Sequence, residues 1–571
     1  MIKIFRNITF AGLFCMTVSS CTKDFKEVNT DPSIVQNPDI RFLLSYAEDK
    51  MVTGYGEGEW VWENMEQLLR YTQHITTDPY EITTNVNSRY TNYYQRVLPN
   101  LVEIRKQIDL KADKEVYQKM AVVPYILQVC EGLKVTDMNG SIPYSEANMA
   151  RSDNKYNPVY DNQEVLLNNF LSQLDQAITV LSGSSSDQQT YGNADIYYKG
   201  DFTKWIKLAN SLKLRIAARL ENQNVDKTKQ IFQQVLQDAV GPIDAVDGQL
   251  QYSSIDYNGI GGGVDYRSAR YGTTSIINFL KKSNDPRLSI YFQANDLSGS
   301  YNDTLTKYGV SLPAFISPAD PLIRYQGAPA DWTTNGTVAG FVKNPFAVGN
   351  TNTGNTITRY FLISPINRRF FYPRYTDPKT GQAGNGRYTE VIVSHAETCL
   401  LIAEFIEKGY AGSADTKGTA EDWYKKGVAS SIRTMNNVSA VAQSGTVFTD
   451  DGTAVINTYL SGNDVKFNGV NDLERIYVQQ YLNLFRNPNE AFVFTRRTGY
   501  PKKTSAYYAR EVFNEQIARR WWTNDPGEVN RTNWNAALSD QGFTPNQRDL
   551  PTLSSQRIWY DKTAPDFGGG Q

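Results

Sequence analysis

The segment Arg89–Leu110, RYTNYYQRVLPNLVEIRKQIDL, carries the strongest periodic signal in this chain of 571 residues. Its apolar side chains recur at spacings of three and four residues, at Tyr90, Tyr94, Val97, Leu101, Ile104 and Ile108. This spacing places all of them on one face of an α-helix. A helix with one apolar face needs a neighbour to cover it, so the segment predicts a protein built by packing helices together.

The same periodicity returns along the chain. The further helices are expected at about residues 114–136, 166–181, 205–220, 389–408, 420–434 and 472–485. Asp201 stands where it can cap the helix that begins near Trp205, and Gly409 stands where a helix would end. The first two helices follow each other after a short polar break, so we expect them to form an antiparallel pair.

These repeated pairs indicate the fold class. Each helix-turn-helix pair needs a neighbouring pair to bury its apolar face, which is typical of tetratricopeptide-like superhelices. The spacing between pairs is irregular, so a regular solenoid is not expected. The sequence therefore predicts a mostly α-helical protein with long insertions between some pairs.

The amino terminus has the pattern of an export signal. Two basic residues precede a short apolar stretch, Ile8–Val18, and two serines then lead into Cys21. The stretch is roughly half the ~20 residues that a membrane-spanning helix needs. We predict a cleaved signal peptide at 1–20 and a lipid on Cys21, which opens a polar tether at 21–40. The alternative is an ordinary secretory signal with Cys21 near the cleavage point by chance.

Composition excludes several classes of protein. With 40% hydrophobic and 21% charged residues, the chain resembles a globular protein more than a disordered or integral membrane protein. The formal net charge of -2 means that the chain has no excess of basic residues, so a nucleic-acid-binding protein is not expected. Of the four cysteines, Cys130 and Cys399 remain after the signal and the lipid site, and both lie in helical patterns. Buried free thiols are therefore favoured over a disulfide.

The interval 241–386 differs from the helical segments in composition and sequence pattern. It is rich in glycine, asparagine and isolated aromatic residues, and it lacks sustained helical periodicity. Long loops on a rigid helical scaffold are where binding residues concentrate. We place the ligand site there, with a contribution from the earlier loop around Tyr80. The segment after Pro501 is also irregular, but its tryptophans indicate an ordered wrap over the helices.

The sequence offers little catalytic chemistry. Its two histidines, His74 and His395, lie far apart, and no nucleophile motif surrounds either one. His395 and Cys399 share a helix face, but two ligands do not make a zinc site, so no metal and no cofactor is predicted. A glycosidase needs only two carboxylates about 5–10 Å apart. The sequence neither shows nor rules out such a pair.

A series of short motifs is similar to those of the SusD/RagB-like family of nutrient-binding outer-membrane lipoproteins, in its branch with an "NTDP" opening. The motifs are VNTDP at 28–32, TDMNGSIPYSEA at 136–147, PVYD at 158–161, ANSLKLR at 209–215, NDPRL at 284–288, NPNEA at 487–491, RRTGYP at 496–501 and RIWYD at 557–561. Together they span nearly the whole chain in order. Two positions depart from the family pattern: Asn139 replaces an aromatic residue, and Tyr560 stands where tryptophan is frequent. Most of these motifs read as structural, with Arg215 and Arg287 anchoring buried carboxylates or carbonyls.

The resemblance implies a function and a partner. Members of the family form one compact helical body, which here would be a single domain at 41–571. They are not enzymes. They capture a nutrient, usually a glycan, at the cell surface and deliver it to a SusC-like TonB-dependent transporter in the outer membrane.

The loop aromatics suit such a ligand. Apolar faces of sugar rings stack on aromatic side chains while hydroxyls pair with amides and carboxylates. The predicted ligand-facing residues are Tyr80, Tyr257, Tyr266, Tyr325 and Trp332. Three alternatives stay open: the same scaffold binding peptides or another nutrient, a glycoside hydrolase, and a purely structural surface protein.

Overall fold

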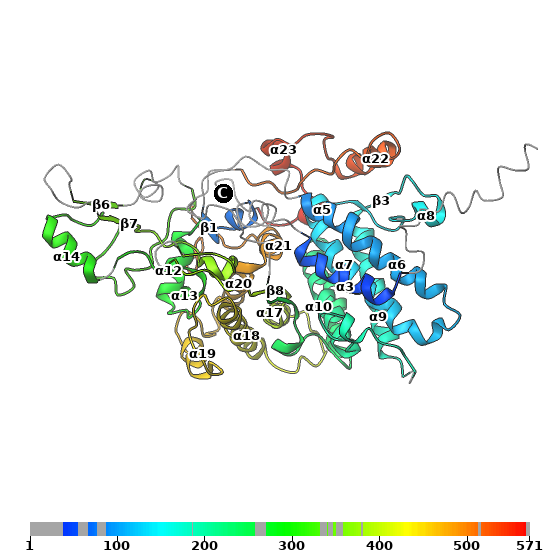
Figure 1. The fold of residues 1–571 in the computed structure, drawn as a ribbon, viewed down its shortest axis with the longest axis horizontal. Helices are drawn as coiled ribbons and strands as arrows, with labels where there is room; N and C mark the ends of the chain where they lie inside the picture. Colours follow the sequence, from blue (N-terminus) through cyan, green and yellow to red (C-terminus); the bar gives the residue numbers. More distant parts are fainter. Residues whose placement is uncertain are drawn as a thin grey trace, which may run out of the picture.

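The computed structural model of the chain describes residues 38–54, 67–76, 87–184, 187–256, 270–297, 299–331, 340, 346–349, 358–377, 381–511 and 516–566. Within these ranges the protein is mostly helical, as predicted. Figure 1 shows the helices in two adjoining groups, one formed by the amino-terminal part of the chain and one by helices between Thr274 and Thr498, with the carboxyl-terminal segment lying across both. None of the described helices combines the length and apolar character that a bilayer crossing demands.

The first predicted helix is confirmed as a continuous helical segment. It consists of α5 (Ser88–Asn92), a π-helical turn (Tyr93–Val97) and α6 (Leu98–Asp109). Val97, Leu101, Ile104 and Ile108 are buried in the main core, and Tyr94 packs against that core from a half-buried position. The spacing in the sequence therefore identified the buried face correctly.

The amino-terminal group contains α5 and α6 together with five further helices. These are α3 (Ile40–Thr53), α7 (Gln118–Asn139), α9 (Gln163–Ser182), α10 (Phe202–Leu220) and α11 (Val225–Gln237). Each packs against its neighbour, α6 on α7, α7 on α9, α9 on α10 and α10 on α11. The Asp201 side chain accepts hydrogen bonds from the backbone amides of Thr203 and Lys204 and caps α10 as predicted. Every residue of α10 from Leu208 to Leu220 is buried.

The second group contains one correction to the predicted helices. Residues 389–393 were expected to begin a helix, but they belong to strand β8 (Tyr388–Val393), which pairs antiparallel with β4 (Leu250–Ser254). The run of β-branched residues in β8 favours a strand once a partner strand is present. Helix α17 (His395–Glu407) begins only after β8, where Ser394 caps it. Gly409 lies just after the end of α17 and has a φ of 74°, a left-handed conformation that suits a glycine at the end of a helix. This confirms the predicted end of the helix.

The rest of this group follows α17. It contains α18 (Ala420–Val441), α19 (Thr453–Leu460), α20 (Asp472–Asn483) and α21 (Pro488–Thr498). Helix α17 packs against α18 and α20, and it also contacts α10 of the first group. Cys130 of α7 and Cys399 of α17 are buried free thiols, which confirms the prediction.

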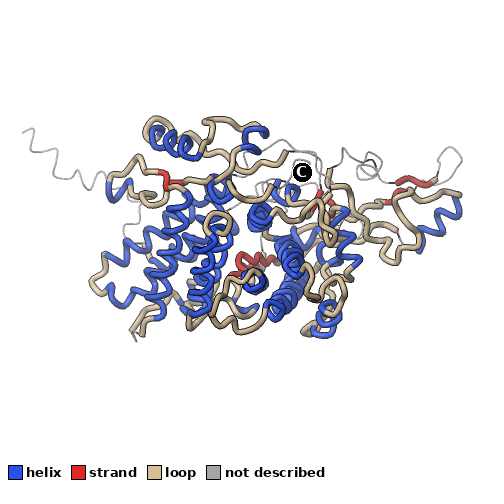
Figure 2. The backbone as a smooth tube through the Cα atoms, turned by 180° about the vertical axis from the view of Figure 1, so that it is seen from behind, coloured by secondary structure: helices blue, strands red, loops and turns tan. Residues whose placement is uncertain are grey.

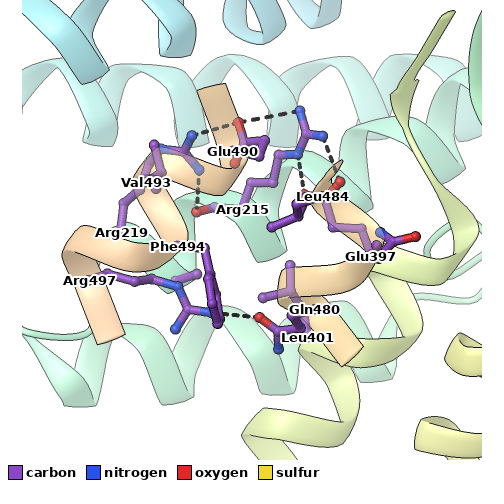
Figure 3. Close-up of a pocket in the computed structure, with 12 residues that line it drawn as sticks. Arg215, Arg219, Glu397, Leu401, Gln480, Leu484, Glu490, Val493, Phe494 and Arg497 are labelled. Carbon is purple, nitrogen blue, oxygen red and sulfur yellow. Dashed lines mark hydrogen bonds and ion pairs between the residues drawn. The ribbon is translucent and has the colours of Figure 1, made fainter. Parts of the chain in front are cut away.

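A buried ionic network joins the two groups. Arg215 and Arg219 of α10 reach Glu397 of α17 and Glu490 of α21, and Arg219 also binds Asp137 of α7 through two hydrogen bonds of 2.9 and 2.7 Å. Figure 3 shows the guanidinium groups of Arg215 and Arg219 beside the carboxylates of Glu397 and Glu490. The predicted anchoring role of Arg215 is confirmed, and so is that of Arg287, which binds Asp285 and Gln479.

The loop-rich interval contains a small lobe, whose described residues are 297, 299–323, 346–349 and 358–362. Its described elements are α14 (Gly299–Tyr308), β6 (Phe346–Val348) and β7 (Thr358–Tyr360), and strands β6 and β7 pair antiparallel. Leu297, Ile316 and Leu362 belong to a buried apolar cluster separate from the main core. Figures 1 and 2 show the lobe extending from the side of the molecule.

The carboxyl-terminal segment wraps over the helices, as predicted. It carries α22 (Arg531–Gln541) and α23 (Leu550–Ser555). Trp521 and Trp534 are fully buried, and the backbone amide of Trp521 donates to the carbonyl of Met138 at 2.8 Å. This segment therefore closes the body instead of trailing from it.

Candidate functional site

A cavity of about 450 Å³ lies where the small lobe joins the body, and we call it the neck pocket. It falls inside the loop-rich interval 241–386. The lining residues are Tyr271, Gln293, Ala294, Asn295, Asp296, Phe361, Ile363, Pro365, Arg368, Tyr375 and Asp377. A volume of this size is within the range of small-molecule sites, about 300–1,000 Å³.

Two antiparallel segments form the wall of the neck pocket. Gln293 donates its backbone amide to the carbonyl of Pro365 at 2.8 Å, and Asp296 donates its amide to the carbonyl of Phe361 at 3.0 Å. The Asp296 carboxylate in turn accepts from the amide of Phe361 at 2.9 Å. These bonds hold both ends of the small lobe together and fix the direction of the Phe361 side chain.

Aromatic rings supply the apolar surface of the neck pocket. Phe361 is 47% exposed although its backbone is held at both polar atoms, whereas Tyr271 and Tyr375 are mostly buried. Short helix α16 (Arg368–Phe371) places Arg368 so that its guanidinium donates to the Tyr375 hydroxyl at 2.5 Å. The same guanidinium lies 5.2 Å from the centre of the Tyr375 ring. The pair is thus fixed before any ligand arrives.

The polar groups of the neck pocket divide into two kinds. Asn295 is structural, because its side chain donates to the carbonyls of Ile323 and Leu362 and accepts from the amide of Leu297. Gln293, Asp296 and Asp377, which are half-buried, complete the polar part of the lining. An aromatic surface next to amide, carboxylate and guanidinium groups is suited to a ligand with apolar faces and hydroxyl edges.

Figure 3 shows a different cavity, which has a structural role. It lies inside the buried ionic network and has room for about 30 Å³, close to the liquid volume of one water molecule. Burial alone would raise the pKa of Glu490, but the guanidiniums of Arg215 and Arg219 outweigh it and hold that pKa at about 2. The carboxylate is therefore kept charged and paired, as a structural anchor needs.

No metal site emerges from the part of the chain that the structure describes, where no three His, Cys, Asp or Glu side chains are grouped suitably. His395 Nε2 lies 3.1 Å from Cys399 Sγ, as expected for two residues on one helix face. Burial raises the pKa of the Cys399 thiol to about 12 and lowers the pKa of His395 to about 4. The pair is neutral and closely packed.

Only one of the predicted ligand-facing aromatics can be placed. Tyr325 is half-buried and packs against the main core, and its carbonyl accepts from the Lys281 ammonium at 3.0 Å. It does not line the neck pocket. Tyr80, Tyr257, Tyr266 and Trp332, together with Cys21, lie outside the described residues.

The aromatic residues of the neck pocket were not singled out from the sequence. Nothing local separates Phe361, Tyr375 or Tyr271 from the other aromatics of the same interval. The exposure of Phe361 depends on pairing with Asp296, which is 65 positions away. In the sequence, only the loop-rich composition of the interval 241–386 indicated that a ligand site lies in this part of the chain.

Comparison with known proteins identifies relatives. Residues 32–334 and 346–522 match the model of a SusD-like family described as starch-binding and associating with the outer membrane. A comparison with curated proteins finds no match.

Solved structures share the fold over 92% of this chain. A chitin-binding protein is 22% identical with a TM-score of 0.65, and a SusD homologue from Bacteroides fragilis is 16% identical with a TM-score of 0.64. A chitin-binding SusD homologue from Flavobacterium johnsoniae is 18% identical with a TM-score of 0.59. In each case the whole of the other chain is covered.

Proposed function

The chain belongs to the SusD-like family of outer-membrane-associated binding proteins, and from this premise we propose that it captures a glycan and delivers it, chemically unchanged, to a TonB-dependent transporter. The glycan would bind in the neck pocket. The lipid on Cys21 would hold the protein at the outer membrane, facing the cell exterior.

The neck pocket is the observation that carries this proposal. Phe361 offers an exposed ring on a rigid backbone, and a sugar ring can stack its apolar face there. Arg368 is already oriented by Tyr375, so binding a ligand hydroxyl costs little further ordering of that side chain. Two structural relatives are described as chitin-binding, which supports a polysaccharide as the source of the glycan that binds here.

Affinity electrophoresis tests the proposal. The protein is run through native gels that contain soluble starch or glycol chitin, and a retarded band gives the dissociation constant. Replacing Phe361 by alanine removes the stacking surface and should weaken binding about ten-fold, or ~1.4 kcal/mol. Phe42→Ala is the matched control, since Phe42 is 74% exposed on α3 and does not line the pocket.

Two outcomes would contradict the proposal. If Phe361→Ala and Phe42→Ala bind as well as the unchanged protein, the neck pocket is not the glycan site. If incubation with the polysaccharide releases reducing sugars, the protein is a hydrolase, and the carboxylates of Asp296 and Asp377 become the first residues to replace.

The transporter and the lipid anchor need a separate experiment. The full chain with its native leader is expressed in its own host, and the membrane fraction is solubilised and purified through a tag on the protein. A TonB-dependent transporter should co-purify, and Cys21→Ser should shift the protein to the soluble fraction. A membrane-bound Cys21→Ser variant would contradict the lipid assignment.

A further inference from the structure

A cavity of about 480 Å³ lies between the β4–β8 ribbon and helix α18, and we call it the ribbon cleft. Its lining residues are Val246, Asp247, Gln249, Gln251, Thr389, Thr434, Asn437, Val438 and Val441. None of them lines the neck pocket. We propose that the ribbon cleft is a second binding site, specific for an uncharged polyhydroxylated ligand such as a segment of neutral glycan.

The ribbon turns a polar face toward α18. Leu250 and Tyr252 of β4 are buried on one face, and the alternation of a strand places Gln251 and Ser253 on the other. Ser253 lies directly opposite Thr389 of β8. A sheet face directed at a helix is normally apolar and closely packed. Here amides and hydroxyls face an open volume instead, which is the arrangement of a binding surface.

The amides of this face are held in position by one another. Gln249 is only 5% exposed, and its Nε2 donates to Oε1 of Gln251 at 2.9 Å. Nε2 of Gln251 donates to the Ser253 hydroxyl at 3.3 Å, and the Thr434 hydroxyl donates to Oε1 of Gln249 at 3.5 Å. The row therefore presents donors and acceptors alternately in fixed places. A sugar hydroxyl, which both donates and accepts, can pair with either kind.

The opposite wall is the face of α18. Thr434, Asn437, Val438 and Val441 follow one another at helical spacing, so they share this face. Asn437 is exposed, and Val441 is 39% exposed at the rim. The valines offer apolar surface to the carbon-hydrogen faces of a ring, while Asn437 adds an amide across from the ribbon.

Charge defines the class of ligand. Among the described residues of the lining, Asp247 is the single ionisable one. Its side chain is 82% exposed and lies 3.7 Å from the Lys204 ammonium, which also donates to the Asp247 carbonyl. The cleft thus has no net charge to attract a phosphate, a carboxylate or an ammonium group. A neutral ligand rich in hydroxyls satisfies the amides without leaving a buried charge unpaired.

Calorimetric titration tests the ribbon cleft. The full chain is titrated with neutral trisaccharides, including maltotriose and triacetylchitotriose, which are short enough to occupy the sites independently. We expect two binding events. Val441→Trp fills the cleft from its rim and should remove one event. Phe361→Ala should weaken the other event about ten-fold, and the double variant should show only that weakened event.

Two further variants keep this test sharp. Lys425→Trp adds the same ring to α18 at an exposed position outside the cleft lining and should leave both events intact. Gln251→Ala removes one amide from a half-buried position and should weaken the second event at least five-fold without filling the cleft. Thermal melts of all variants confirm that they fold.

Each outcome decides the matter. A single event that Phe361→Ala weakens and Val441→Trp leaves unchanged would overturn the ribbon cleft and leave the proposed function standing. Absence of any binding to the unchanged protein would overturn both.

Discussion

Replacing Arg219 by methionine is the most informative test of what holds the two helix groups together. The guanidinium of Arg219 is almost completely buried and makes a two-pronged contact with Asp137 and a 2.8 Å contact with Glu490. Methionine keeps much of the side-chain volume but removes the charge. Among the described residues, the Asp137 carboxylate would retain Asn489 and Tyr560, and Glu490 would retain Arg215 at 3.7 Å.

The burial of this ion pair gives the expected magnitude. Removing one member of a buried ion pair costs about 3–5 kcal/mol, because the remaining charge stays buried without compensation. The pKa of Glu490 is lowered by Arg215 and Arg219 together, so the variant removes part of what keeps this carboxylate charged. We therefore expect Arg219→Met to lower the free energy of unfolding by about 3–5 kcal/mol, or the melting temperature by roughly 3–4 °C for a chain of this length.

Differential scanning calorimetry at pH 7 measures the effect. The matched control is Arg531→Met, because Arg531 pairs with Asp525 at 3.2 Å on the surface, where its side chain is about half exposed. Exposed pairs contribute about 0–1 kcal/mol, so this variant should melt within 1 °C of the unchanged protein. Equal shifts for the two variants would refute the claim that the buried network stabilises the fold.

Three smaller predictions follow from other residues. Burial lowers the pKa of His74 to about 3, whereas an unfolded histidine titrates near 6.5, so stability should fall as the pH drops from 6.5 toward 3. His74→Gln should flatten the melting temperature against pH over that range, and an unchanged slope would contradict the assignment. Asp201→Ala should cost about 1 kcal/mol in urea unfolding, since it removes the cap of α10, and no loss would argue against the cap. Cys130 and Cys399 should not react with Ellman's reagent until the protein unfolds, because burial raises both thiol pKa values to about 12, and rapid labelling of the native protein would disprove this.

The helical part of the fold was predictable because its information is local. The spacing from Tyr90 to Ile108, the cap at Asp201 and the stop at Gly409 all operate within a few residues. The error at 389–393 has the opposite cause. Whether that run forms a helix or a strand depends on β4, which lies more than a hundred residues earlier, and no local pattern reports the presence of a partner strand.

The candidate sites were harder to predict from the sequence, because they too depend on contacts between distant segments. The neck pocket exists because residues 293–296 meet residues 361–365, and the ribbon cleft exists because β4, β8 and α18 meet. Aromatic composition indicated which interval to examine but not which rings face a cavity. Tyr325 shows the limit of that reasoning, since its ring packs on the core and does not line the neck pocket.

The carboxyl-terminal wrap has a consequence for the order in which the molecule assembles. The side chains of Asn87 and Asn139 donate to the carbonyl of Trp522, and the backbone amide of Ser141 donates to the side chain of Gln541, so early residues are completed by partners about four hundred positions later. Contacts between such distant residues form late, after the intervening chain has been brought together. The first helices can therefore collapse as soon as they are synthesised, but their polar groups stay unsatisfied until the last segment arrives. A chain truncated before Trp521 should resemble an arrested folding intermediate more than a smaller native protein.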